Sequence, residues 1–189
     1  MYSKYIDYLK ETLNEHRFEH SLNVADECKK LAERFNYDAN KAYLCGLLHD
    51  ICKNDSQEKM LQIFNKFDII LDNVQRSTPL LWHSIAGAVF IQAKFGIDDE
   101  EIIDAVRFHT TGREDMTKLD KIVYLADVIS VDRDFDGVEN LREISRKNLD
   151  LAVFECLKSS IKDLSSKNKL IHIDTIKAYN FLAEKGCKL

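Results

Sequence analysis

Six side chains in this sequence carry the imidazole and carboxylate groups that divalent metal ions bind. They all belong to apolar, helix-like stretches: His20, His49, Asp50, His83, His109 and Asp127. His49 and Asp50 close the apolar run Cys-Gly-Leu-Leu-His-Asp-Ile, and Asp127 lies in Ile-Val-Tyr-Leu-Ala-Asp-Val-Ile. A carboxylate in such surroundings is costly unless a cation or hydrogen-bond donors compensate it. Neutral imidazole and bridging carboxylate together are typical of divalent-metal sites, and of metal-assisted phosphate hydrolysis.

The structural alternative is that these groups only stabilise the fold. A single histidine in an apolar helix is more often a hydrogen-bonded core or helix-end residue than a ligand. Asp50 and Asp127 would then each pair with an arginine, a lysine or a backbone amide. Two acids and four histidines on different helices of one small domain favour the metal interpretation.

Composition limits the fold and the class of partner. One proline and six glycines among 189 residues favour an all-α fold. The formal net charge of −5 argues against non-specific nucleic-acid binding. Five scattered cysteines without a C-x-x-C motif indicate a reducing compartment. The N-terminal residues do not resemble a signal peptide, and no apolar run approaches the roughly 20 residues that span a bilayer. We therefore expect a cytoplasmic protein without a membrane partner.

Apolar periodicity predicts the elements that must position these residues. Helices are expected over 3–14, 20–35, 39–52, a short stretch after Ser56, 82–95, 98–109, 118–130, 141–165 and 174–185. Residues 66–80 and 131–140 are expected to be irregular, with Asp174 capping the last helix and Gly186 following it. We expect one domain over 1–189, with a metal-ligand core at about 17–130 and C-terminal helices 141–185 completing a helical bundle.

The order His20, His49-Asp50, Asp127 resembles the HD superfamily of metal-dependent phosphohydrolases. His83 and His109, between the HD pair and Asp127, match its dinuclear subset. More narrowly, residues 5–182 resemble the bacterial YqeK family of symmetrical diadenosine-tetraphosphate hydrolases. The most specific matching blocks are Phe-His-Thr-Thr-Gly-Arg at 108–113 and Arg-Asp-Phe-Asp-Gly-Val at 133–138. The sequence departs from the family pattern at three places. The family usually has Glu-Pro where this sequence has Ser130-Val131, and it tends to have proline where this sequence has Asp136 and Ile173.

This resemblance implies roles for the six residues. Asp50 would bridge two divalent metal ions, with His20, His49 and Asp127 completing one coordination sphere and His83 and His109 holding the other ion. A metal-bridging hydroxide would attack phosphorus, giving two ADP from diadenosine tetraphosphate, and Asp50 or Asp127 would orient the nucleophile. The resemblance favours iron, while the ligand types also fit manganese, cobalt or zinc.

Other residues are candidates for contact with a small nucleotide. Lys53, one turn after His49, would assist catalysis and bind phosphate, or else be a solvated helix-end lysine. Arg133 offers a fork for phosphate, with pairing to Asp132 or Asp134 as the alternative. Weaker candidates are Thr110 and Gly137, which offer hydroxyl and amide donors, and His172 and Thr175 near the last helix; His172 is alternatively a surface residue. A homodimer is left open.

Three other functions are compatible with part of this pattern. The same site would serve a 5′-deoxynucleotidase or a guanosine-tetraphosphate hydrolase, although neither needs His83 and His109. A non-catalytic nucleotide sensor would keep the metal for structure alone. A cyclic-dinucleotide phosphodiesterase of the HD-GYP type is disfavoured because the sequence contains no Gly-Tyr-Pro.

Overall fold

A computed structural model describes residues 2–187, and within them the chain is all-α, as predicted. The elements are α1 (Ser3–Thr12), α2 (Glu15–Arg34), α3 (Ala39–Leu48), α4 (Gln57–Lys66), α5 (Asn73–Ser77), a 3-10 turn η1 (Pro79–Leu81), α6 (Trp82–Phe95), α7 (Glu100–Phe108), α8 (Lys118–Ile129), α9 (Val138–Ser145), α10 (Leu149–Ser166) and α11 (Ile173–Glu184). In the described part of the chain no helix is long and apolar enough to cross a membrane.

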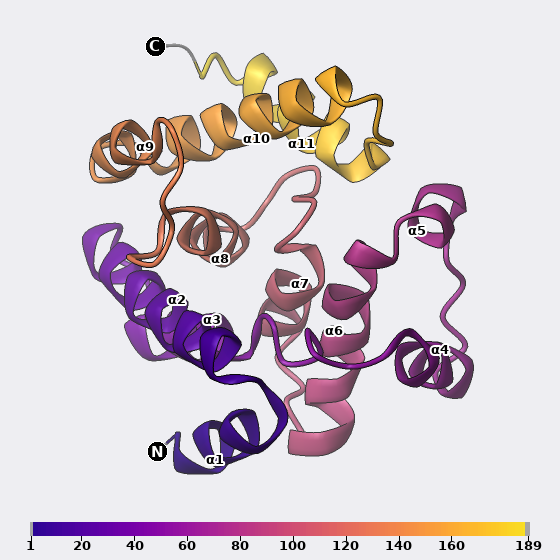
Figure 1. Cartoon of the computed structure of the whole chain (residues 1–189). Coiled ribbons are helices and arrows are strands. Elements are labelled where there is room, and N and C mark those ends of the chain that lie inside the picture. The colour runs from indigo at the N-terminus through magenta and orange to yellow at the C-terminus, as the bar shows by residue number, and fades with distance from the viewer. Residues whose placement is uncertain (1, 188–189) are drawn as a thin grey trace.

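Helices α2, α3, α6, α7 and α8 form the centre of the bundle; α9 and α10 pack on α8, and α11 packs on α10 (Figure 1). α2 and α3 pack closely because Gly46 has no side chain. A Cβ atom at that position would lie 2.7 Å from the Cys28 sulfur and 2.9 Å from the Cα of Ala25. This close approach brings the end of α3, with His49 and Asp50, against the His20 side of α2.

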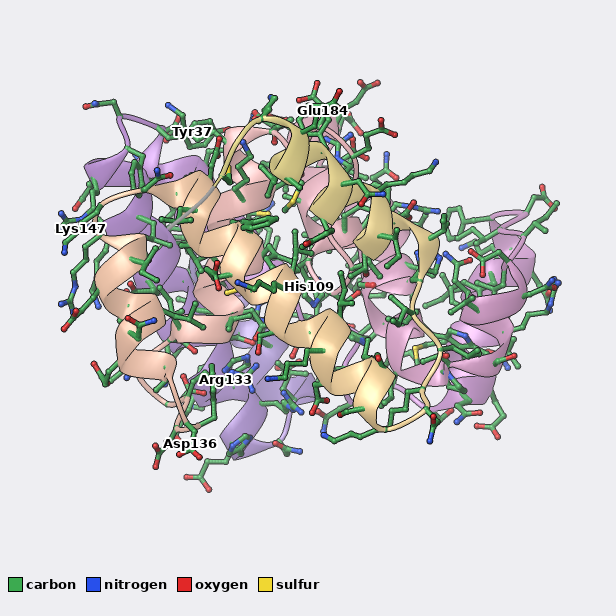
Figure 2. The ribbon with its side chains drawn as sticks, turned by 90° about the horizontal axis from the view of Figure 1, so that it is seen from above. Tyr37, His109, Arg133, Asp136, Lys147 and Glu184 are labelled. Carbon is green, nitrogen blue, oxygen red and sulfur yellow. The ribbon has the colours of Figure 1, made fainter. Side chains whose placement is uncertain are left out.

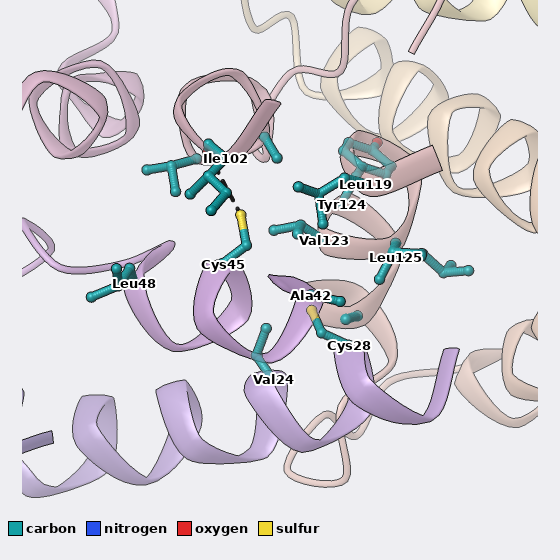
Figure 3. Packing of buried hydrophobic residues seen from close by; sticks show 14 of the residues in the cluster. Val24, Cys28, Ala42, Cys45, Leu48, Ile102, Leu119, Val123, Tyr124 and Leu125 are labelled. Atoms are coloured by element: carbon teal, nitrogen blue, oxygen red, sulfur yellow. Dashed lines mark hydrogen bonds between the residues drawn. The ribbon is translucent and has the colours of Figure 1, made fainter. Parts of the chain in front are cut away.

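The apolar core fills the space between these central helices (Figure 3). Four of the cysteines, 28, 45, 52 and 156, are buried as small apolar side chains, as expected from their sequence context. The Cys45 thiol also lies 3.7 Å from the carbonyl oxygen of Ile102, a contact that joins α3 to α7. Trp82 belongs to the core as well, and its indole N–H donates to the carbonyl of Gln75.

Several predicted helix boundaries are wrong, and local capping explains them. α2 begins at Glu15 rather than residue 20, because the Asn14 side chain accepts the Arg17 amide. The single helix predicted over 141–165 is two helices, since Asn148 is extended and caps a new one. α11 is capped by His172 rather than by Asp174.

Two further differences affect the surroundings of the candidate site. α3 ends at Leu48, so His49 is its C-cap and Asp50 begins a series of turns rather than a continued helix. Within the predicted irregular stretch 66–80, Asp72 and Gln75 form a reciprocal capping box that starts the short α5. The following turn η1 leads directly into α6 and His83.

Candidate metal centre

The structure brings all six predicted ligands together at the centre of the bundle. They come from α2 (His20), the end of α3 (His49, Asp50), the first turn of α6 (His83), the end of α7 (His109) and α8 (Asp127). Possible ligand atoms lie within 4.8 Å of one another in three groups: His20, His49 and Asp50; His49, His109 and Asp127; and Asp50, His83 and His109. Asp50 belongs to a group on each side, which is the position required of a bridging carboxylate.

Three of the histidines are oriented by the same backbone contact. Nδ1 of His49 lies 2.7 Å from the carbonyl oxygen of Gly46, three residues earlier. The corresponding distance is 2.8 Å from His83 to Leu80 and 2.8 Å from His109 to Val106. Because a carbonyl only accepts, the proton of each neutral ring is on Nδ1 and the lone pair is on Nε2. All three Nε2 atoms therefore direct an unprotonated lone pair, available to a metal ion, toward the centre.

The Nε2 atom of His49 is buried and has no hydrogen-bond partner. It lies 3.7 Å from Oδ2 of Asp50 and 3.9 Å from Oδ1 of Asp127. Burial lowers the pKa of His49 to about 4, so the ring is neutral at pH 7. A buried lone pair without a donor is rare in folded proteins, and a divalent cation would satisfy it.

His83 and His109 also point their lone pairs toward each other. Their Nε2 atoms are 3.2 Å apart, and they lie 3.1 Å and 3.5 Å from Oδ1 of Asp50. Two facing lone pairs beside a carboxylate oxygen attract positive charge. The ammonium group of Lys53 lies there, 3.0 Å from His83 and 3.2 Å from Asp50.

Both carboxylates are ionised. Burial by itself raises the pKa of Asp50, but the neighbouring His49, His109 and His83 outweigh it and hold the pKa well below the usual range. Burial also opposes ionisation of Asp127, where the hydrogen bond with His20 lowers the pKa. Two negative charges and four imidazoles in one buried cluster are the donor set of a divalent-metal site.

His20 is oriented differently, by a side chain that the sequence analysis did not identify. Its Nε2 lies 2.9 Å from Oδ1 of Asp127, and its Nδ1 lies 2.7 Å from Oδ2 of Asp132. Asp132 is therefore the partner that fixes the ring of His20. Its place in a polar loop, beside several other acids, gave no signal that distinguished it.

Asp50 and Asp127 also have the arginine and lysine partners that we expected if they served only to stabilise the fold. Arg17 and Lys53 pair with Asp50 at 3.4 Å and 3.2 Å. Arg133 donates from Nε to the carbonyl oxygen of Asp127 at 2.7 Å and also contacts the Asp127 carboxylate. The suggested pairing of Arg133 with Asp132 or Asp134 is therefore wrong. These pairs leave Nε2 of His49 unsatisfied, so the donor set still fits a metal.

Arg17 had no predicted role, although a signal for it existed. It lies three residues before His20, and residues at that spacing share one face of a helix. Because α2 begins at Glu15 rather than residue 20, Arg17 belongs to the same helix as His20. The missed helix start thus concealed this contact to Asp50.

The predicted nucleotide-contacting residues fall in different places. Thr110, His172 and Thr175 line one cavity of about 430 Å³. His172 is buried, and its Nε2 lies 2.7 Å from Oδ2 of Asp72, so its interpretation as a surface residue is wrong. Gly137 lies at the start of α9 with a positive φ of 96° and does not line this cavity.

Arg133 and Lys53 contact different members of the candidate metal-ligand cluster. Arg133 lies nearer the edge of the molecule than the central His109, in the loop between α8 and α9 that also carries Asp136 (Figure 2). Lys53 lines a second cleft of about 640 Å³, together with His83. Both side chains contact a ligand carboxylate directly, Asp127 and Asp50 respectively.

Comparison with known proteins identifies an HD domain in the part of the chain that contains the six clustered residues. Residues 17–132 match the model of the HD domain. The chain is 37% identical to the symmetrical bis(5′-nucleosyl)-tetraphosphatase of Bacillus subtilis, over 92% of this chain and 93% of that protein. It is also 37% identical to the enzyme of that name from Staphylococcus aureus, over 93% of each.

A solved structure extends the likeness to the whole backbone. It is a predicted HD superfamily hydrolase involved in NAD metabolism, from Clostridium acetobutylicum. The two superpose with a TM-score of 0.94 at 37% identity, covering 98% of each chain.

Proposed function

Because this chain belongs to the HD domain family, and is similar over nearly its whole length to symmetrical bis(5′-nucleosyl)-tetraphosphatases, we propose that it hydrolyses diadenosine tetraphosphate to two ADP. HD-domain membership implies dependence on a divalent metal, and the chain carries the buried histidine and aspartate cluster this requires. The observation that carries the proposal is the position of Asp50, whose two oxygens face His49 on one side and His83 and His109 on the other.

The cluster would hold two divalent ions. His20, His49 and Asp127 would hold one, His83 and His109 the other, and Asp50 would touch both; iron is favoured, with manganese, cobalt and zinc as alternatives. Divalent cations in such a site lower the pKa of bound water and neutralise phosphate oxygens. The lone pairs that the Gly46, Leu80 and Val106 carbonyls direct inward support this division.

The remaining residues would bind and orient the substrate. Asp127 is held by Arg133 and His20, so it is fixed where it can orient an attacking water. Lys53 and Arg133 would neutralise phosphate charge. Thr110, His172 and Thr175 would contact one nucleoside in the first cavity, whose wall includes the aromatic rings of Tyr124 and Phe135.

The test is to reconstitute the metal-stripped protein with iron(II) or manganese and to offer diadenosine tetraphosphate. Stoichiometric release of two ADP is expected, with loss of turnover and of metal in Asp50→Ala. Asp26→Ala, at an exposed acid of α2, is the matched control and should behave as wild type. Turnover of deoxynucleoside monophosphates or guanosine tetraphosphate in its place would support a different HD hydrolase. No turnover at full metal loading would support the nucleotide-sensor alternative.

A further inference from the structure

Two cavities lie next to residues of the candidate metal-ligand cluster, and only the first has been assigned a nucleoside so far. The first, of about 430 Å³, includes Thr110, which follows the ligand His109, and Val128, which follows Asp127. The second, of about 640 Å³, includes the ligand His83 together with Lys53 and Arg17, the two cations that contact Asp50. Leu80, which is 76% exposed, lines both and forms the ridge between them.

The two cavities differ in chemistry. The first is walled mainly by apolar and aromatic side chains, and its acid, Asp163, is paired with Lys167. The second is lined by two cations and by the amides of Asn54 and Gln57, with Met60 as an apolar patch. Its only lining acid, Asp55, is paired with Lys59 at 2.6 Å. The second cleft is therefore suited to a phosphate chain attached to a group that has both polar and apolar parts.

Cleavage at the centre of a dinucleoside tetraphosphate makes a specific demand on the site. Water adds to one central phosphorus, the bond from that phosphorus to the bridging oxygen breaks, and the oxygen leaves on the second ADP. Because attacking and leaving oxygens are in line, the two halves must extend away from the cluster in different directions. A chain with a single nucleoside cavity would leave one half of the substrate unbound.

Resting on the proposed function, we propose that the second cleft binds the leaving ADP half of the substrate. Arg17 and Lys53 would contact its phosphates beside Asp50, and the nucleoside would lie along Asn54, Gln57 and Met60. Arg17 and Lys53 contact the Asp50 carboxylate from the side of this cleft, and their side chains are 30% and 25% exposed. They are thus accessible to a ligand in the cleft while they remain in contact with the ligand carboxylate.

The test fills the cleft without touching the metal ligands. Gln57 is exposed at the first position of α4, so Gln57→Trp would obstruct the cleft at little cost to folding. Gln62→Trp, an exposed glutamine of the same helix that does not line the cleft, is the matched control. Each is assayed on diadenosine tetraphosphate and on adenosine tetraphosphate, which has the same phosphates but one nucleoside.

Gln57→Trp should lower kcat/KM for diadenosine tetraphosphate at least tenfold more than for adenosine tetraphosphate, because the obstructed cleft excludes the second nucleoside. Gln62→Trp should leave that ratio unchanged. Equilibrium dialysis with labelled ADP gives a readout independent of turnover: two ADP per chain are expected for wild type and Gln62→Trp, and one for Gln57→Trp.

The outcomes separate the two proposals. If wild type cleaves diadenosine tetraphosphate but Gln57→Trp has the same substrate ratio and ADP stoichiometry as Gln62→Trp, the second-cleft assignment is overturned and the proposed function stands. If wild type does not cleave diadenosine tetraphosphate, the proposed function fails first. One ADP per chain in the wild-type protein would also overturn the assignment.

Discussion

The ammonium nitrogen of Lys53 lies 3.0 Å from Nε2 of His83, a nitrogen that has no proton of its own in the neutral ring. The same ammonium is 3.2 Å from Asp50. Lys53 thus contacts both the carboxylate at the middle of the cluster and a histidine on one side of it. It also faces the cleft, so its charge is available to a phosphate.

Replacing Lys53 by methionine should lower kcat for diadenosine tetraphosphate by roughly 100-fold, the scale of losing one preorganised charged contact. All six proposed metal ligands remain, so metal content should stay near wild type. The measurement is steady-state kinetics combined with elemental analysis. Lys66→Met, which removes an exposed lysine of α4 that does not line the cleft, is the control and should retain activity. Unchanged turnover in Lys53→Met would contradict its role.

Asp132 fixes the ring of His20, and its removal should weaken metal binding indirectly. We expect Asp132→Ala to reduce metal affinity by about 10–100-fold, the usual effect of losing a partner of a ligating histidine. Competition with a chromogenic chelator measures this directly. Asp134→Ala, two residues away and exposed, should leave affinity unchanged. Equal affinities for the two variants would show that Asp132 does not position His20.

Gly46 and Gly87 are both helical glycines in the buried centre, but they should respond oppositely to alanine. At Gly46 the new Cβ would meet the Cys28 sulfur at 2.7 Å, so Gly46→Ala should cost about 1–3 kcal/mol of unfolding free energy. At Gly87 the nearest atoms are 3.4 Å away, so Gly87→Ala should be neutral or add up to about 1 kcal/mol. Urea unfolding compares the two. A wild-type midpoint for Gly46→Ala would mean that α2 and α3 separate easily.

Asp120 should contribute a distinct pH dependence to stability. Burial raises its pKa above the ordinary 3.8, outweighing the Thr117 amide and Arg113, and one carboxylate oxygen has no partner. The folded protein therefore holds this proton more tightly than the unfolded chain. Its stabilising contribution is complete below pH 3.8 and is lost as the pH rises through the folded pKa.

Asp120→Asn removes that titration, so unfolding free energy should rise for the variant relative to wild type as pH increases above about 4. Chemical unfolding across a pH series tests this, with the exposed Asp98→Asn as a control that should track wild type. A trend of opposite sign would mean that the ion pair with Arg113, at 2.8 Å, determines the behaviour of Asp120.

The clustering of the six histidine and aspartate residues could be predicted because each of them conflicts with its surroundings. Asp50 and Asp127 are charged residues within apolar stretches, and that conflict is visible in the sequence alone. Arg17, Asp132 and His172 present no such conflict, because charged and polar residues near turns are common. The contacts of Arg17 and His172 depend on helix starts at residues 15 and 173, which capping by Asn14 and His172 determines rather than apolar periodicity.

The ion-pair partner of Arg133 also could not be predicted from the sequence. The polar loop after α8 offers Arg133 a choice among several acids, and proximity in sequence favoured Asp132 or Asp134. In the folded chain Arg133 turns back to Asp127, six residues earlier, and contacts both its carbonyl and its carboxylate. Such a choice depends on the path of the loop in three dimensions.

The backbone contacts of His49, His83 and His109 have a consequence for mutational scanning. Their orienting partners are the carbonyl groups of residues 46, 80 and 106, and a peptide carbonyl is the same whatever side chain accompanies it. A scan of all substitutions would therefore find that activity is sensitive to changes at these three histidines. It would find no second position whose side chain must be kept as the hydrogen-bond partner of any of them. Only His20, whose partner is the carboxylate of Asp132, would reveal its support as a second sensitive position.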